Sequence, residues 1–168
     1  MRRRLLLHVL GCALCVSGAF QHARAQGNAG LAILGDVTTP LSVKADDLTA
    51  MPRKTVEVKD QGGATVTYEG VLVGELLKRA GVPVGGDLRG AALSTYVKAS
   101  ATDGYQVVFS LGELDPALSG SDIIVADTAD GKPLSDTQGP LRIMVPRDAR
   151  PARSVRMLER LEVVRLKK

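Results

Sequence analysis

The sequence predicts an α+β fold, with mixed β-sheets and few, short helices. Two observations support this class. Short segments in which apolar and polar residues alternate recur along the chain, separated by turns rich in Gly, Pro and Asp. A single segment, residues 71–80, has the apolar spacing of a clear amphipathic helix. Strands followed by an isolated helix and further strands are typical of an α+β domain.

Two strands, a short helix and a hairpin are expected first. Residues 31–34 and 41–43 are apolar segments on either side of a Thr-Pro break, and residues 46–51 begin with two aspartates, as a helical turn often does. Residues 55–59 and 64–68 both alternate, and the two glycines between them provide a turn. We therefore predict a β-hairpin over residues 55–68.

The helix predicted at residues 71–80 has a well-defined apolar side. Two pairs of apolar residues are spaced four apart, while Glu75 can pair with Arg79 on the opposite side. Gly81, followed by Val-Pro, ends the helix. Its apolar side should pack on a sheet.

Further strands are expected at residues 93–100, 106–110 and 161–166, and residues 123–126 form a continuous apolar run typical of a buried strand. Near the C-terminus, strand alternation at residues 141–145 directs Arg142 away from three apolar neighbours. Alternation at residues 154–158 likewise places Ser154 and Arg156 on one face.

The N-terminus predicts export. Three arginines after Met1 precede an apolar run that ends near Phe20, and an Ala-Arg-Ala cleavage motif ends at Ala25. We expect residues 1–25 to be a signal peptide and residues 26–168 to be a single domain. The signal peptide contains four arginines and no acidic residue, so the net charge of +4 belongs to it and the mature chain is neutral. A nucleic-acid partner is therefore not expected.

Both cysteines and both histidines, Cys12, Cys15, His8 and His22, lie in the expected signal peptide. The mature chain would have no disulfide, no thiolate or imidazole metal ligand, no cysteine nucleophile and no histidine base. Few enzyme mechanisms remain possible.

The mature chain concentrates basic residues at its C-terminal end. Five arginines lie on or beside a proline-rich loop at residues 146–151: Arg142, Arg147, Arg150, Arg153 and Arg156. The guanidinium group suits phosphate, carboxylate or the edge of a heterocycle. From these residues alone, charge balance across the fold is a slightly better explanation than a binding site. Asp103 and Tyr105 similarly suit an ordinary turn.

Three blocks in the same order give a more specific indication. GKPLSDTQGPLRIMVP at residues 131–146, continued by residues 152–163, resembles the C-terminal half of the molybdopterin-binding domain of the sulfite oxidase family. Residues 68–82 and 103–114 are similar to its earlier blocks. The resemblance runs from about Gly35 to Val164. It implies a sulfite oxidase-type molybdopterin-binding fold with a pterin pocket.

The resemblance also implies site residues. Arg142, Ser154 and Arg156 match positions that contact the pterin and its phosphate in the family. Asp103 and Tyr105 would lie on the neighbouring wall of the pocket. Gln138 stands where catalytic members commonly have histidine, and it would contact the edge of the ring.

Departures from the family favour binding over catalysis. Catalytic members hold molybdenum through a cysteine, which the mature chain lacks, and the signal peptide lacks the extended twin-arginine motif. We therefore expect a periplasmic, non-catalytic protein that binds a pterin such as molybdopterin, without molybdenum. Resemblance to stand-alone members suggests a ligand sensor for a membrane signalling protein, such as a cyclic-di-GMP enzyme with a periplasmic domain. The alternatives are a small molybdopterin-dependent oxidoreductase, or a subunit of one, and a scaffold whose pocket binds nothing.

Overall fold

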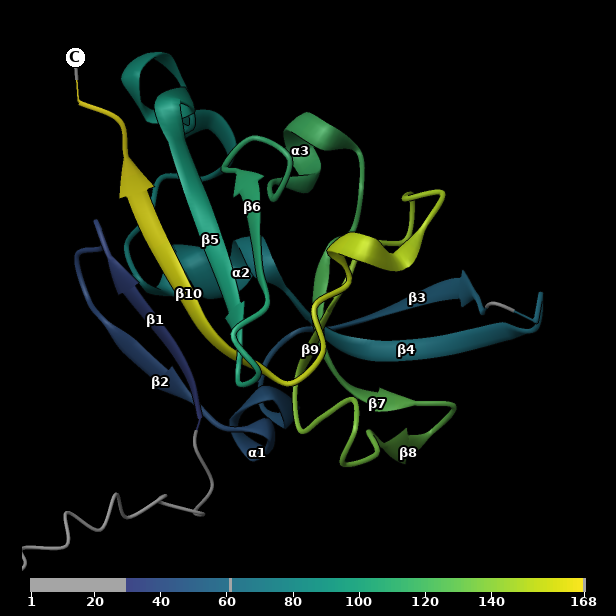
Figure 1. Ribbon diagram of the computed structural model, residues 1–168. Helices are drawn as coiled ribbons and strands as arrows, with labels where there is room; N and C mark the ends of the chain where they lie inside the picture. The colour runs from purple at the N-terminus through teal and green to yellow at the C-terminus, as the bar shows by residue number, and fades with distance from the viewer. Residues whose placement is uncertain (1–29, 61, 168) are drawn as a thin grey trace, which may run out of the picture.

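The computed structural model describes residues 30–60 and 62–167, which form two β-sheets joined by short helices (Figure 1). The α+β class expected from the sequence is confirmed, as are the mixed pairing and the shortness of the helices. The expected signal peptide at residues 1–25 lies outside the described residues. No helix in the described part of the chain is long and apolar enough to cross a membrane.

The first sheet has the strand order β2-β1-β10-β5-β6. The strands are β1 (Leu31–Gly35), β2 (Leu41–Val43), β5 (Thr95–Ala101), β6 (Gln106–Ser110) and β10 (Leu158–Arg165). Strand β1 pairs with β10 in parallel, and all other pairs of this sheet are antiparallel. The sheet therefore joins the two ends of the domain.

The second sheet is antiparallel and has the order β3-β4-β7-β8, with β9 also paired to β7. Its strands are β3 (Arg53–Lys59), β4 (Thr65–Leu72), β7 (Ile124–Ala129), β8 (Lys132–Pro133) and β9 (Arg142–Met144). The hairpin predicted over residues 55–68 is confirmed as β3 and β4, which extend away from the first sheet in Figure 1.

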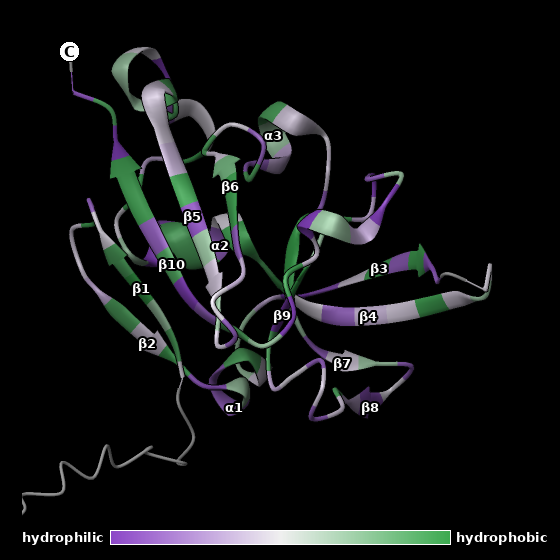
Figure 2. Ribbon diagram, viewed as in Figure 1, coloured by the Kyte–Doolittle hydropathy of each residue, from purple (hydrophilic) through white to green (hydrophobic). Residues whose placement is uncertain are grey.

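The main core lies between the first sheet, one face of the second sheet and helix α2 (Val73–Arg79). Green, apolar segments meet there in Figure 2. Strand alternation sends Val125 and Ile143 of the second sheet into this core, while Tyr68 and Met144 belong to a smaller apolar cluster on the opposite face. Arg142 lies on that opposite face, as predicted.

Helix α2 begins two residues later than the sequence suggested. Val71 and Leu72 continue β4 because they pair with β7, so the prediction that they start the helix was wrong. The predicted pair of Glu75 and Arg79 is confirmed, with 2.9 Å between Oε1 and Nε. The remaining helical segments are α1 (Ala45–Thr49), η1 (Gly85–Asp87), η2 (Gly90–Ser94), α3 (Pro116–Ser119) and η3 (Pro151–Arg153).

The extended strand expected at residues 154–158 does not form. Met157 has a φ of 48°, which interrupts an extended backbone, and the last strand begins only at Leu158. The segment is held instead by hydrogen bonds from the amide of Ile143 to the carbonyl of Val155 and from the amide of Met157 to the carbonyl of Gln138. Ser154 and Arg156 are thus positioned by a loop.

Gly70 is required where β4 pairs with β7, at an irregularity in the register between the two strands. A Cβ atom at this position would lie 2.0 Å from the carbonyl oxygen of Val125, a backbone atom that cannot move away without breaking the ladder. We expect Gly70→Ala to cost about 3 kcal/mol of unfolding free energy, measured by urea denaturation. Gly86→Ala is the matched control, since its Cβ would enter open space. Equal stability of the two variants would contradict this packing.

An ion pair with two hydrogen bonds joins β3 to β7 in the second sheet. Arg53 donates from Nη1 and Nη2 to the two carboxylate oxygens of Asp127, at 2.7 Å each. Burial alone would raise the pKa of Asp127, but the hydrogen bonds from Arg53 and Thr128 outweigh it and hold the pKa below its ordinary value. The hydrogen bonds that Arg53 donates to Asp127 and Glu69 outweigh its own burial and raise the pKa of Arg53.

The lowered pKa of Asp127 predicts acid sensitivity. A carboxylate whose folded pKa is depressed stabilises the fold above its unfolded pKa, here the ordinary value of 3.8, and the contribution disappears as the pH falls below that value. We expect Asp127→Asn to cost about 2 kcal/mol at pH 7 and less at pH 3. Asp122→Asn, which removes an exposed partner of Lys54, should cost less than about 0.5 kcal/mol. Urea denaturation at both pH values would show the difference, and an equal cost at pH 7 and pH 3 would refute it.

Candidate functional site

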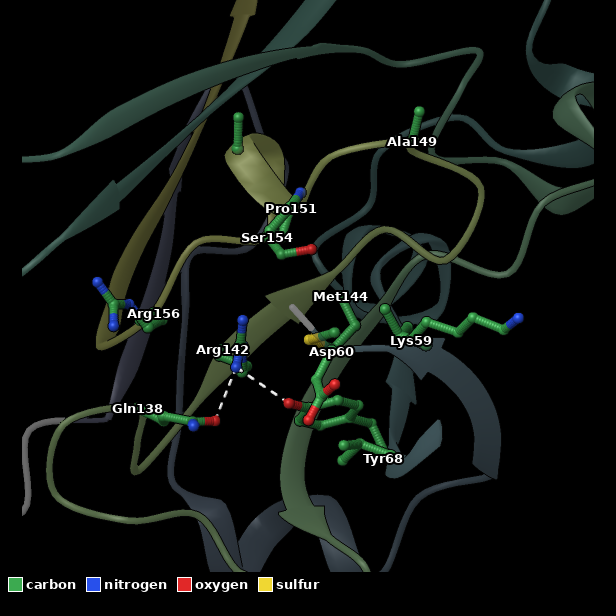
Figure 3. Close-up of a pocket in the computed structure, with 13 residues that line it drawn as sticks. Lys59, Asp60, Tyr68, Gln138, Arg142, Met144, Ala149, Pro151, Ser154 and Arg156 are labelled. Atoms are coloured by element: carbon green, nitrogen blue, oxygen red, sulfur yellow. Dashed lines mark hydrogen bonds between the residues drawn. The ribbon is translucent and has the colours of Figure 1, made fainter. Parts of the chain in front are cut away.

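A cavity of about 560 Å³ opens on the face of the second sheet that is turned away from the main core. The hairpin, strand β9 and two loops contribute to its lining (Figure 3). The lining residues from the hairpin are Val58, Lys59, Asp60, Val66 and Tyr68, and those from β9 and its preceding loop are Gln138, Arg142 and Met144. The rest of the lining is Ala149, Pro151, Ala152, Ser154 and Arg156. The stretch of residues 146–154 is called the roof below.

Arg142 is the central polar residue of this cavity. Its side chain is buried, with 7% of the residue exposed, and its Nη1 donates to Oε1 of Gln138 at 2.7 Å and to the hydroxyl of Tyr68 at 3.2 Å (Figure 3). The guanidinium carbon lies 5.2 Å from the centroid of the Tyr68 ring, a cation–π distance. Two neutral side chains therefore orient this cation.

Arg142 has no carboxylate partner among the described residues, and its buried Nε makes no hydrogen bond to any of them. Burial lowers the pKa of Arg142; Tyr68 opposes this effect and the nearby charge of Arg156 adds to it. A buried cation without a counter-charge costs free energy. A ligand that carries negative charge or hydrogen-bond acceptors would therefore stabilise Arg142 in this cavity.

Ser154, Arg156 and Gln138 complete a wall that is rich in donors. The Ser154 hydroxyl oxygen accepts a hydrogen bond from the amide of Val145 at 3.2 Å, which leaves its hydrogen available to donate. Gln138 has its oxygen engaged by Arg142, so its NH₂ group remains available. Arg156 is exposed at the cavity and forms no ion pair within the described part of the chain.

Four of the six predicted binding residues line the same cavity, although they come from separate blocks: Gln138, Arg142, Ser154 and Arg156. Asp103 and Tyr105 do not line it. Asp103 accepts a hydrogen bond from the amide of Tyr105 at 2.9 Å and so stabilises a turn, and the Tyr105 hydroxyl reaches the roof from outside. The structure therefore does not bring Asp103 and Tyr105 into this cavity with the other four residues.

Sequence reasoning missed the hairpin side of the cavity. The alternating pattern places Lys59 and Tyr68 on strands and Asp60 in the turn between them, and it does not indicate a binding role for any of the three. Alternation could have shown that Val66 and Tyr68 share a face, but it does not reveal which face meets Arg142. Asp60 is engaged in its turn, since its Oδ1 accepts from the amides of Gly62 and Ala64.

This chain shares its fold with a solved enzyme structure. It is similar to a chain of the sulfane dehydrogenase SoxCD from Paracoccus pantotrophus, with a TM-score of 0.62 and 23% sequence identity. The similarity covers 80% of this chain and 37% of that chain, so this chain spans little more than a third of its structural neighbour.

Sequence comparison then identifies the family. The family model described as "Oxidoreductase molybdopterin binding domain" matches residues 22–168, and the chain therefore belongs to that family. A comparison with curated proteins found no match. Membership confirms the resemblance stated from the three blocks and indicates a pterin as the class of cofactor.

The cavity suits the ring system of a pterin. A pterin presents a carbonyl oxygen and ring nitrogens as acceptors, and the accessible Nη2 of Arg142 and the NH₂ of Gln138 are donors without a partner in the described chain. The apolar side chains of Val58, Val66 and Met144 can contact the faces of a planar ring. In residues 30–60 and 62–167, no group of three or more His, Cys, Asp or Glu side chains is placed to hold a metal ion.

Proposed function

We propose that this protein is a periplasmic, non-catalytic pterin-binding protein. The observation that carries the proposal is the buried Arg142, which donates hydrogen bonds to two neutral side chains and pairs with no carboxylate among the described residues. An acceptor-rich ligand would accept a hydrogen bond from Nη2 of Arg142, which has no partner within the described chain and is not buried, and would stabilise the charge. The cavity volume of about 560 Å³ lies within the range of small-molecule sites.

A division of roles within the cavity follows from burial. Arg142 lies deep, where exclusion of water strengthens hydrogen bonds to a heterocycle, and we propose that it contacts the ring edge. Arg156 is exposed at the mouth, where it can meet a phosphate or another anionic substituent. Ser154 can donate to either part.

Binding without catalysis is supported by the residues of the cavity. Its lining includes neither histidine nor cysteine, and its one carboxylate, Asp60, is engaged by the amides of its own turn. No lining residue in the described chain is paired as a nucleophile with a base. The alternative, a small molybdopterin-dependent oxidoreductase or a subunit of one, predicts bound molybdenum and activity with a redox partner.

We further propose that the protein reports pterin binding to a membrane signalling protein, such as a cyclic-di-GMP synthase or phosphodiesterase with a periplasmic domain. This partner is proposed from the resemblance to stand-alone members of the family, together with the expected signal peptide. Cellular cyclic-di-GMP should change when the gene is deleted, and wild-type protein but not a variant defective in pterin binding should restore it. Unchanged cyclic-di-GMP would remove this partner class.

Direct titration tests the binding proposal. Purified protein without the signal peptide is titrated with pterin-6-carboxylate, a fluorescent anionic pterin, and its fluorescence anisotropy is followed. We expect a Kd of about 10 µM or tighter, corresponding to about 7 kcal/mol. Adenosine, a heterocycle with a different donor and acceptor pattern, should not compete. No binding at about 1 mM, together with no bound pterin in native protein, would contradict the proposal.

A further inference from the structure

The roof has two sides. Its inner side lines the cavity, and its outer side contacts the rest of the protein. Ala149, Pro151, Ala152 and Ser154 line the cavity. Two side-chain hydrogen bonds join the roof to residues just before and just after β6, an edge strand of the first sheet. The proposed binding function leaves these outer contacts unexplained.

Arg153 makes the first set of outer contacts. Its Nε and Nη2 donate to the two carboxylate oxygens of Asp148 at 2.8 and 2.7 Å, which ties one end of the roof to the other. Its Nη1 donates to Oε1 of Glu113 at 2.6 Å, and its guanidinium lies 5.4 Å from the ring centroid of Phe109 in β6. Arg153 thus joins two residues of the roof to each other and joins the roof to Glu113, which follows β6 in the sequence.

Tyr105 makes the second contact, at the beginning of β6. Its hydroxyl donates to the carbonyl oxygen of Ala152 at 2.7 Å, and Ala152 is a lining residue of the cavity. The turn carboxylate of Asp103 holds the backbone of Tyr105 in place. Tyr105 is 49% exposed, so packing in the core does not account for its orientation.

We infer that Tyr105 and Arg153 are positioning residues, which hold the roof in its ligand-binding conformation without touching the ligand. The inference rests on the proposed pterin-binding function. A roof that opens must be closed again on binding, so the apparent affinity falls with the population of the closed form. Loosening the roof should therefore weaken binding mainly by speeding dissociation.

Two conservative substitutions with matched controls test this inference. Tyr105→Phe removes the hydroxyl, and its control is Tyr96→Phe, at a half-buried tyrosine of β5 that does not line the cavity. Glu113→Gln removes the charge that faces Arg153, and its control is Glu162→Gln. Glu162 pairs with Lys98 at 2.7 Å, and its side chain is 30% exposed, against 33% for Glu113.

Two measurements are made on each variant: the affinity for pterin-6-carboxylate, and amide hydrogen exchange of the roof in ligand-free protein. We expect Tyr105→Phe to raise Kd about fivefold and Glu113→Gln about threefold, through faster dissociation. Exchange at residues 147–150 and 152–154 should be faster in both variants, while the controls match the wild type.

The two measurements separate failure of this inference from failure of the proposed function. Unchanged Kd in both variants, or unchanged exchange in the roof, would overturn the positioning role. If the wild type itself does not bind the pterin, the proposed function fails, and the exchange rates still decide whether Tyr105 and Glu113 hold the roof closed.

Discussion

Replacing Gln138 with glutamate is expected to stabilise the fold and to weaken pterin binding strongly in the same variant. The substitution keeps the shape of the side chain but places a carboxylate where an amide oxygen now lies 2.7 Å from Nη1 of Arg142. The buried cation then has the counter-charge that it lacks. We expect unfolding free energy to rise by about 1–2 kcal/mol, because a hydrogen bond between neutral and charged groups becomes one between two ions.

The affinity for the pterin should fall in the same variant, although its stability rises. An anionic ligand would meet a cavity whose central charge is already neutralised, and we expect its Kd to rise about 100-fold. Gln106→Glu, at an exposed position of β6, is the matched control and should change neither quantity beyond the effect of surface charge. The variant is assayed by urea denaturation and by pterin titration. A Gln138→Glu protein that binds as tightly as the wild type would show that Arg142 does not determine affinity.

Replacing Arg142 with methionine is expected to remove binding without unfolding the protein. Methionine retains most of the length and the apolar contacts of the arginine stem but has no donor. Each charge-assisted hydrogen bond to the ligand contributes about 1.5–3 kcal/mol, so the loss of two would raise Kd by at least about 100-fold.

The stability of the Arg142→Met protein is informative in itself. Exchanging a buried cation that lacks a counter-ion for an apolar side chain is expected to be neutral or stabilising, because the desolvation cost disappears. Arg160→Met, at an exposed position of β10, is the control for removal of one arginine. If Arg142→Met leaves pterin affinity intact, the cavity is not the binding site. If neither the wild type nor the Arg142→Met protein binds the pterin, the scaffold alternative is correct.

The sequence predicted the position of Arg142 well because strand alternation is a local property. Leu141, Ile143 and Val145 enter the main core, so Arg142 had to lie on the other face of β9. Alternation also predicted the β3–β4 hairpin. It could not reveal that Tyr68 would meet Arg142, because 74 residues separate them and only the pairing of β4 and β9 on either side of β7 brings them together.

Alternation failed where the backbone leaves the extended region. Residues 154–158 have a strand-like pattern, but the positive φ of Met157 and the turn of η3 make the segment a loop. Tyr105 shows a second limit. Its resemblance to a family position suggested a pocket wall, whereas its hydroxyl donates a hydrogen bond to the carbonyl oxygen of Ala152, 47 residues away. Long-range contacts of this kind leave no periodic trace in a sequence.

We propose that the cavity around Arg142 holds a pterin that no protein thiolate joins to a metal. The most direct test is to purify the protein from its native cells, denature it, and assay the released material for pterin fluorescence and for molybdenum. We expect stoichiometric pterin without molybdenum. Stoichiometric molybdenum would contradict this proposal in favour of the oxidoreductase, and the absence of any pterin would contradict the binding function itself.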